Sequence, residues 1–287
     1  MGLTDSKKSS NQPLRHQKLG RCVCSTWNTH NVGLPVPRGT PVVEARVIAV
    51  SNQKGGVGKT TSVINLASYC ALAGRRTLVV DCDPQANASS VLASKIEGRS
   101  LFLGQEAIPT SEDNLWIVPS SPALIDEERR IARLDGGRFV LRQRLAPLRS
   151  QFDLILMDCP PNLSWLSTNA LLAADYLVLP LQCEYFAIEG LGQLLAYVED
   201  VRQDAGATIE LLGILLTMYD DRHPIARQVA ADMRTHFGAK VFARPIPRDI
   251  ALAAAPSHAQ SILNYDPISN GAIAYAAAAK ELLNGLK

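Results

Sequence analysis

Short runs of apolar residues recur along the chain from about residue 43 onward, and longer stretches with helical spacing lie between them. Uninterrupted runs of Val, Ile and Leu, bounded by turn residues, are typical of strands that are buried on both faces. They predict strands at 46–51, 76–81, 115–120, 152–158, 175–181, 211–220 and 240–246. The stretches between them predict helices at 59–73, near 138–149, 163–173, 188–205, 222–237 and 270–286.

Strands that alternate with helices indicate a parallel sheet with helices on both faces. The sequence therefore predicts an α/β fold with a doubly wound, mostly parallel sheet, in which ligands bind at the carboxyl ends of the strands. The first 42 residues are different, because they are rich in Ser, Asn, Gln and Pro and show no sustained period. We expect a disordered basic tail and linker at 1–42 and one folded domain at 43–287.

Charge is unevenly distributed along the chain. Residues 1–40 carry six basic residues against one acidic residue, a balance of +5, whereas the whole chain has a net charge of +2. The rest therefore carries −3. A basic tail on a slightly acidic body suggests a negatively charged partner, although a solvated leader explains the composition equally well.

Cysteine usage favours a reducing, cytosolic setting. Four of the six cysteines lie in apolar runs, where a reduced thiol behaves as a small hydrophobic group. Cys22 and Cys24 lack the second pair of ligands that a zinc site needs. No apolar run is long enough to cross a bilayer, so we expect no stable membrane association.

The stretch SNQKGGVGKTT at 51–61 follows the first predicted strand and opens the first predicted helix. Its glycines let backbone N–H groups converge at a helix N-terminus, which is an arrangement that binds phosphate. Lys59 is placed to reach the β- and γ-phosphates of a nucleotide, Thr60 to bind Mg²⁺ and Thr61 to add a second hydroxyl. The loop departs from the standard pattern G-x-x-x-x-G-K-[ST], because a glutamine replaces the first glycine and a second lysine follows it.

Carboxylates end two of the other predicted strands. Asp158 closes the run LILMD, a usual position for a residue that holds Mg²⁺ through water. Asp81 and Asp83 close LVVDCD and point the same way, because alternate residues of a strand share a face. We expect Asp83, which is nearer the glycine loop, to orient the attacking water. A single acid at a strand end is more often a helix cap or turn residue, and it is the glycine loop that favours the catalytic interpretation.

Six segments together resemble the ParA/Soj branch of the deviant Walker ATPases, which are relatives of MinD. They are KGGVGKTT, VDCDPQAN, DCPPNLS, the Q-x-EYFAIEGL segment, LLGILLTMYD and IPRDIALAAAPSH, in order between residues 46 and 286. The resemblance implies a P-loop ATPase domain at 43–287 with weak intrinsic turnover. In that family the lysine that matches Lys54 reaches across a dimer interface to the phosphates of the second subunit, which accounts for the additional positive charge.

The resemblance also assigns the site residues. Those expected to act in catalysis are Lys54, Lys59 and Asp83. Those expected to bind ATP are Lys54, Gly55, Gly56, Val57, Gly58, Lys59, Thr60, Thr61, Met218 and Pro247. Those expected to hold Mg²⁺ are Thr60 and, through water, Asp158.

The partners implied are a second copy of the chain, non-specific DNA and a ParB-like centromere-binding protein, with the ATPase associated with the nucleoid in the cytoplasm. The expected DNA-binding residues are Arg222, Arg227, Arg234, Lys240, Arg244 and Arg248. A basic stripe of this kind contacts phosphates without reading bases. The chain departs from the family at Ala251 and Ala254, where relatives carry Arg and Glu, and we expect the basic tail to compensate for the lost contact.

Two other readings use the same loop. A MinD-like membrane-surface or protein-positioning switch needs an amphipathic basic helix, but GAIAYAAAAKELLNGLK is dominated by alanine. An enzyme that resembles the nitrogenase iron protein needs two cysteines that bridge a cluster between subunits, and the glycine-rich settings of those cysteines are absent around Cys159 and Cys183. The sequence leaves open which cargo is moved.

Overall fold

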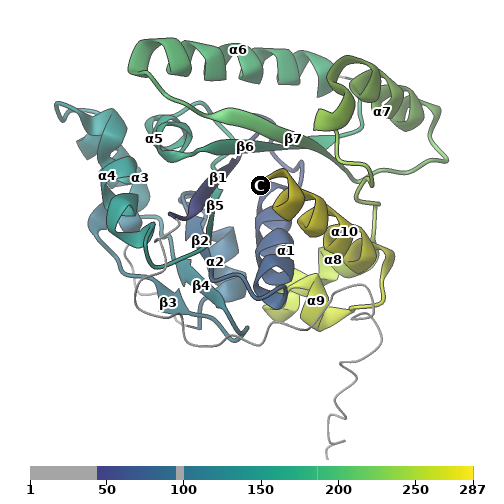
Figure 1. Ribbon diagram of the computed structural model, residues 1–287, viewed down its shortest axis with the longest axis horizontal. Coiled ribbons are helices and arrows are strands. Elements are labelled where there is room, and N and C mark those ends of the chain that lie inside the picture. The colour runs from purple at the N-terminus through teal and green to yellow at the C-terminus, as the bar shows by residue number, and fades with distance from the viewer. Residues whose placement is uncertain (1–43, 95–99, 186, 287) are drawn as a thin grey trace, which may run out of the picture. The chain divides into compact units, whose positions relative to one another are not determined.

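The computed structural model describes residues 44–94, 100–185 and 187–286. Its centre is a seven-stranded sheet with the order β3-β4-β2-β5-β1-β6-β7 (Figure 1). The strands are β1 (Arg46–Val50), β2 (Thr77–Asp81), β3 (Ile108–Pro109), β4 (Leu115–Val118), β5 (Leu154–Asp158), β6 (Tyr176–Gln182) and β7 (Glu210–Thr217). All neighbours are parallel except β3 and β4, which are antiparallel. The predicted doubly wound, mostly parallel α/β fold is confirmed.

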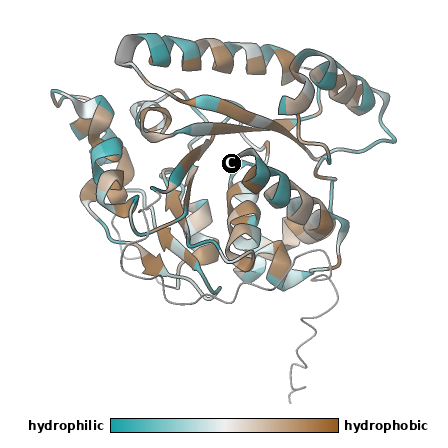
Figure 2. Cartoon of the chain, in the orientation of Figure 1, coloured by the Kyte–Doolittle hydropathy of each residue, from teal (hydrophilic) through white to brown (hydrophobic). Residues whose placement is uncertain are grey.

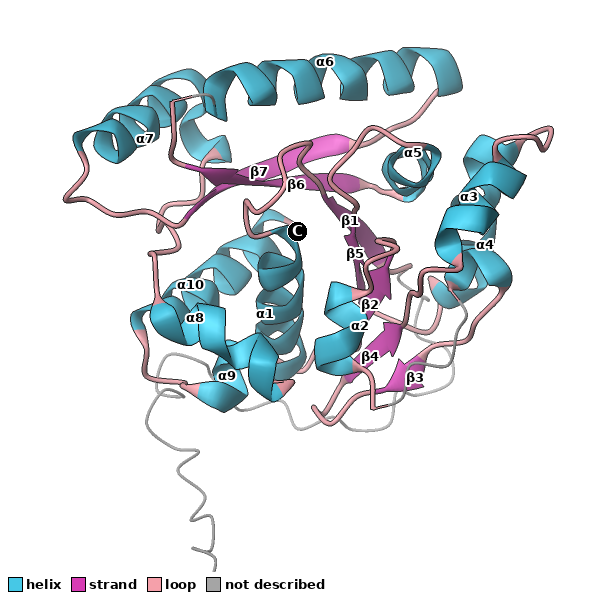
Figure 3. Cartoon of the chain, turned by 180° about the vertical axis from the view of Figure 1, so that it is seen from behind, coloured by secondary structure: helices cyan, strands magenta, loops and turns pink. Residues whose placement is uncertain are grey.

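Helices cover both faces of the sheet (Figure 3). They are α1 (Lys59–Leu72), α2 (Asn87–Leu92), α3 (Leu124–Ile131), α4 (Val140–Leu145), α5 (Trp165–Ala173), α6 (Ala187–Ala205), α7 (Pro224–Phe237), α8 (Ile250–Ala254), α9 (Ile262–Tyr265) and α10 (Asn270–Gly285). Apolar side chains of α3 to α7 form one core with one face of the sheet. Those of α1, α2 and α8 to α10 form a second core with the other face.

Burial on both faces explains why the strands are uninterrupted apolar runs. Along β1, Val47 and Ala49 belong to the first core, whereas Ile48 and Val50 belong to the second. Figure 2 shows the resulting concentration of apolar residues along the central strands, beside the mixed surface of α6. A strand that alternated polar and apolar residues would expose polar groups to one of the two cores.

The predicted strand at 240–246 was wrong. This segment makes two isolated bridges to the sheet edge, Ile214 with Val241 and Tyr219 with Pro247. The Phe242 amide donates to the Ile214 carbonyl at 3.0 Å, but the chain then passes through Pro245 and Pro247, which have no N–H to continue a ladder. Residues 240–247 therefore lie along the edge strand β7 without forming a regular strand, and we call this segment the irregular cover of β7.

The predicted helix near 138–149 was too long. Residues 137–139 and 146–148 are 3₁₀ turns on either side of α4, and Pro147 lies in the second turn. Four short helices, α2, α3, α8 and α9, and the two-residue strand β3 were not predicted, because each is shorter than the pattern that identifies it. The proposed tail at 1–42 lies outside the described residues.

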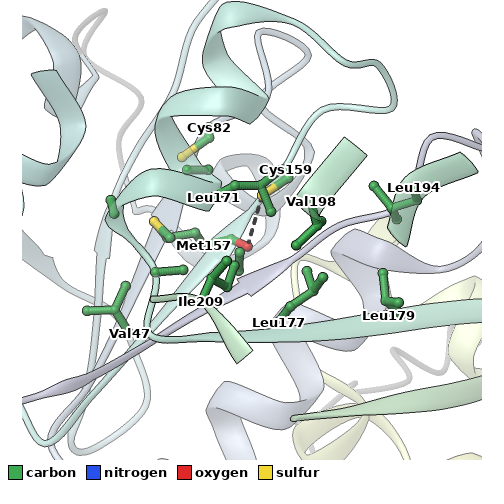
Figure 4. Packing of buried hydrophobic residues seen from close by; sticks show 14 of the residues in the cluster. Val47, Cys82, Met157, Cys159, Leu171, Leu177, Leu179, Leu194, Val198 and Ile209 are labelled. Atoms are coloured by element: carbon green, nitrogen blue, oxygen red, sulfur yellow. Dashed lines mark hydrogen bonds between the residues drawn. The ribbon is translucent and has the colours of Figure 1, made fainter. Parts of the chain in front are cut away.

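Four described cysteines are free and buried: Cys70, Cys82, Cys159 and Cys183. Figure 4 shows Cys82 and Cys159 among the apolar side chains of the first core. Burial raises the pKa of all four thiols, to about 11 for Cys183. They behave as the small hydrophobic groups that the sequence predicts.

Because a thiol reacts as its thiolate, we expect these four cysteines to be inert in the native protein. In a variant that carries Cys22→Ser and Cys24→Ser, a colorimetric thiol reagent should detect almost no fast-reacting thiol at neutral pH. The same sample in denaturant should release all four. Rapid labelling of any of them without denaturant would contradict the described packing.

Candidate functional site

In the loop between β1 and α1, glycines bring backbone N–H groups to the start of a helix that no side chain caps. Gly56 and Gly58 have φ angles of 72° and 86°, a left-handed conformation that glycine adopts without strain. Gly58 precedes α1, and no side chain caps the N-terminus of this helix. A Cβ atom at Gly55 or Gly56 would meet nothing within 4 Å, so the loop borders open space. An uncapped helix N-terminus beside a glycine loop is a suitable cradle for phosphate.

Lys59 lies at the base of this cradle, and its side chain is largely buried. Its ammonium group donates to the Lys54 carbonyl at 3.1 Å. Burial lowers the pKa of Lys59, and the negative charges of Asp158 and Asp83 oppose that change. The lysine thus lies among carboxylates at the point where the sequence predicts the phosphates.

Asp158, at the end of β5, is fully buried. Neither of its carboxylate oxygens accepts a hydrogen bond from a described residue. Burial and the nearby Asp81 raise the pKa of Asp158 well above its usual range, although the Thr60 hydroxyl and the Lys59 ammonium lower it in part. An unpartnered buried carboxylate is costly unless a cation joins it.

These residues fit Mg²⁺. The hard cation takes oxygen ligands and usually keeps several waters, so one hydroxyl and one carboxylate are enough when a nucleotide supplies phosphate oxygens. Within the described ranges no group of three or more His, Cys, Asp or Glu side chains is arranged to hold a metal alone. Thr60 and Asp158 would therefore hold the ion together with a nucleotide.

The carboxylates that follow β2 have different environments. Asp81 accepts three hydrogen bonds: one from the Asp83 amide at 3.1 Å, and two from the amide and hydroxyl of Ser89 at 2.9 Å and 2.6 Å. Among the described residues, the Asp83 side chain accepts a hydrogen bond from the Gln85 amide alone, at 2.9 Å. Asp83 is thus the carboxylate with more capacity to contact a water molecule, which agrees with its expected role.

Lys54 has a partner in its own chain. Its ammonium group lies 2.6 Å from a carboxylate oxygen of Glu184, in the segment that joins β6 to α6, and both side chains are about half exposed. Its backbone amide donates to the Asn52 side chain at 3.0 Å. The predicted contact of Lys54 with a second subunit stays a prediction.

A cavity of about 180 Å³ borders the loop at Gly58 and Thr61. Met218 and Pro247, both expected to bind the nucleotide, line it, and so does Arg248, which was expected to contact DNA. The remaining lining residues, which the sequence did not predict, are Thr217, Ile246, Asp249, Leu252, Ala253 and Tyr275. The Tyr219 amide donates to the Ile246 carbonyl at 3.0 Å and so brings the two segments together, a pairing without any signal in the sequence.

Met218 has a φ angle of 49°, in the left-handed region that few non-glycine residues occupy. Backbone strain of this kind is often found at ligand sites, where the surrounding structure holds it. Here the strained residue faces the cavity beside the phosphate loop.

Intramolecular contacts involve several of the basic residues expected to bind DNA. Arg222 pairs with Asp220 at 2.6 Å and holds the pKa of that carboxyl well below its usual range. On α7, Arg227 donates to the Asp221 carbonyl and Arg234 to the Ala243 carbonyl. Lys240 donates to a carbonyl of β7, whereas Arg244 and Arg248 are exposed. Contacts with carbonyls leave the cationic charge in place, so Arg222 is the residue whose charge is offset most directly.

Comparisons with known proteins identify the relatives of this chain. A family model described as an AAA domain matches residues 45–211. The chromosome partitioning protein ParA of Myxococcus xanthus is 44% identical over 248 residues, covering 83% of this chain and 88% of that protein. The chromosome-partitioning ATPase Soj of Thermus thermophilus is 45% identical over 244 residues, covering 84% of this chain and 96% of that protein. The structure also resembles cobyrinic acid a,c-diamide synthase from Mycobacterium smegmatis with bound ADP and magnesium, with a TM-score of 0.72, 34% identity and coverage of 84% of this chain and 95% of that chain.

Asp158→Asn should make the nucleotide-free protein more stable at pH 7, by about 1–3 kcal/mol, because a neutral amide avoids the cost of either ionising or protonating the buried carboxyl. The variant should lose the extra stabilisation that Mg²⁺ with ATP gives the wild type. Thermal unfolding with ATP and EDTA, and with ATP and Mg²⁺, measures both effects. A variant that is less stable without nucleotide, or equally stabilised by Mg²⁺, would contradict the site.

The wild type should also lose stability as the pH rises from about 4 to about 6. Burial raises the pKa of Asp81 from 3.8 to about 6, so the folded state binds this proton more tightly than the unfolded state. The resulting stability is present below the unfolded pKa and is lost as the pH rises through the folded pKa. Denaturant unfolding across this range without nucleotide measures the slope, which should be smaller in Asp158→Asn because that variant removes a second buried carboxyl whose pKa is raised.

Met218→Asn should weaken ATP binding about fivefold, because the apolar contact in the cavity is lost. Its effect on stability should be small, since asparagine tolerates the left-handed backbone. Met218→Leu retains an apolar side chain of similar size and serves as the control. Titration with a fluorescent ATP analogue measures the affinities, and equal affinities for Met218→Asn and Met218→Leu would show that this side chain does not contact the nucleotide.

Proposed function

Because the chain belongs to the family of ParA and Soj chromosome-partitioning ATPases, we propose that it is an ATP-controlled switch that partitions DNA. It is an ATPase that uses ATP and Mg²⁺. In the proposal, ATP binding yields a homodimer, the dimer binds non-specific DNA, and hydrolysis stimulated by a ParB-like centromere-binding partner releases it. The observation that carries the proposal is the buried, unpartnered Asp158 beside a glycine loop that holds two lysines.

In the proposal, different residues of one subunit bind the phosphates, hold Mg²⁺ and orient the attacking water. The backbone N–H groups from Gly55 to Gly58 bind the phosphates, and Lys59 offsets their charge. Thr60 and, through water, Asp158 hold Mg²⁺, which neutralises phosphate charge when bound. Asp83 orients the attacking water, and Met218 and Pro247 border the rest of the nucleotide.

Lys54 links nucleotide binding to self-association. Its pair with Glu184 is about half exposed, and exposed ion pairs contribute only about 0–1 kcal/mol. The lysine is therefore readily released to a stronger anion, such as the phosphates of a second subunit. Two like-charged surfaces repel unless each supplies a cation to the other, so the dimer forms when ATP is present. With this cation supplied in trans and a partner needed for full activation, we expect slow intrinsic turnover.

The proposed DNA surface follows α7 and the segment after it. Exposed arginines there contact carbonyls of their own chain and keep their charge for phosphates. A dimer doubles these contacts, which makes DNA affinity depend on ATP and fall steeply with salt. The proposed location is therefore the nucleoid in the cytoplasm, with the basic tail at 1–42 as a further source of phosphate contacts.

The structure gives less support to the two alternatives. A membrane-surface switch needs an apolar helix face that is available, but the apolar residues of α10 are largely buried in the second core. None of the helices in the described ranges is long and apolar enough to cross a membrane. An iron–sulfur role needs accessible thiols, whereas Cys159 and Cys183 are 1% and 5% exposed.

The proposal predicts that the wild type binds non-specific duplex DNA with ATP and only weakly with ADP or without nucleotide. Lys54→Ala should lose ATP-dependent DNA binding and ATP-dependent self-association, because the second subunit no longer receives a compensating charge. Lys280→Ala, which removes an exposed lysine on α10, is the matched control and should behave as the wild type. Filter binding across a salt series and light scattering measure the two properties.

Two outcomes would contradict the proposal. DNA binding that is equal with ATP and ADP would remove nucleotide control. Self-association of Lys54→Ala at wild-type ATP concentrations would remove the role of Lys54 in trans.

A further inference from the structure

Asp81 lies at the centre of a buried network that joins three segments. It ends β2, is 1% exposed, and accepts the Ser89 amide and hydroxyl with one carboxylate oxygen. The Ser89 hydroxyl in turn accepts a hydrogen bond from the Ser120 amide, just after β4, at 2.8 Å. The other oxygen of Asp81 accepts the Asp83 amide at 3.1 Å. One carboxylate and one hydroxyl thereby tie the end of β2, the first turn of α2 and the segment after β4.

Through this network Asp81 caps the N-terminus of α2, although it lies outside that helix, on β2. The residue before α2 is Ala86, which has no side chain that can accept a hydrogen bond from the first turn. The amide of Ser89 is one of the N–H groups that a helix start leaves without a partner. Asp81 accepts it from the neighbouring strand, so the position of α2 is fixed relative to β2.

The intervening loop is held at both ends and in between. Gln85 and Ala86 donate their amides to the side chain and the carbonyl of Asp83, both at 2.9 Å. Ala86 has a φ angle of 55°, an unfavourable conformation for a non-glycine residue. Such strain persists only where the surrounding structure holds the backbone in place. Here Asp81 accepts hydrogen bonds from Asp83 and Ser89, on either side of Ala86.

The arrangement is costly for stability alone. Asp81 has no ion-pair partner in the part of the chain that is described, and burial raises its pKa to about 6 despite three hydrogen bonds. Apolar residues at such a position commonly stabilise a protein as well or better. A geometric role explains why a carboxylate is present here.

We propose that Asp81 and Ser89 are positioning residues that hold Asp83 in place for hydrolysis. This inference rests on the proposed role of Asp83 in orienting the attacking water. The negative charge of Asp83 opposes the lowering of the Lys59 pKa by burial, so the loop holds Asp83 near the lysine of the phosphate site. The Ser89 hydroxyl has one proton, and donating it to Asp81 leaves its oxygen lone pairs free for the Ser120 amide. Either side chain therefore acts through the loop and not on the nucleotide.

The test compares Ser89→Ala with Ser90→Ala, its neighbour on the same helix. Ser90 is exposed and its hydroxyl donates to the Asn87 carbonyl, so Ser90→Ala should retain wild-type turnover. Ser89→Ala should lower kcat on the order of 10-fold with ATP affinity unchanged, since a small displacement of a catalytic group has a large effect on rate. Asp83→Ala should lower kcat by on the order of 100-fold.

A double-mutant cycle separates positioning from a general structural defect. If Ser89 acts through Asp83, Ser89→Ala should reduce turnover little further in the Asp83→Ala background, within about twofold. Asp81→Asn, which keeps the shape but has one accepting oxygen, should give the same pattern. Thermal unfolding and ATP binding identify any variant that fails to fold.

The outcomes are distinguishable. Wild-type kcat in Ser89→Ala together with a large loss in Asp83→Ala would overturn the inference and leave the proposed function intact. Equal losses from Ser89→Ala in both backgrounds would show that Ser89 does not act through Asp83. Wild-type turnover in Asp83→Ala would overturn the role assigned to Asp83 and with it the basis of this inference.

Discussion

Concentrated negative charge at the carboxyl ends of β2 and β5 is the constraint on which the rest of the structure depends. Asp81 and Asp158 are register partners on adjacent strands, both are buried, and Asp81 raises the pKa of Asp158. The largely buried Lys59 lies near Asp158, and it opens a helix whose first backbone N–H groups have no side-chain cap. The apolar strands hold these charges in place because burial on both faces leaves the strand ends little freedom. This arrangement of charges suits a metal cation together with a polyanion.

Much of this arrangement is predictable from the sequence, because the strongest patterns are local. The seven-residue run that ends at Asp158 identifies a strand end, and the glycines before Lys59 identify a helix start, without reference to the rest of the chain. What the sequence did not predict depends on pairings between distant segments. The cavity beside Met218 includes residues from the 246–253 segment, and only the packing of that segment on β7 brings them to the loop.

The same distinction explains the misread segment at 240–246. Its composition is that of a strand, and it does lie beside one, but Pro245 and Pro247 prevent a continuous ladder. The left-handed backbone conformations of Ala86 and Met218 were not predicted either, since nothing in the sequence marks an alanine or a methionine that adopts them. Strain of this kind follows from contacts made elsewhere, such as those of Asp81, and a pattern along the chain does not contain them.

The irregular cover along β7 has a consequence for how copies of this chain can associate. An open sheet presents unpaired backbone groups at both edges, and such edges invite other chains to add strands. Here one edge strand, β3, has two residues and ends at Pro109, and the other is bridged at intervals by a segment interrupted by prolines. Indiscriminate growth through strand addition is thereby discouraged at either end of the sheet. Association is left to surfaces made of side chains, where a small change in charge can reverse it.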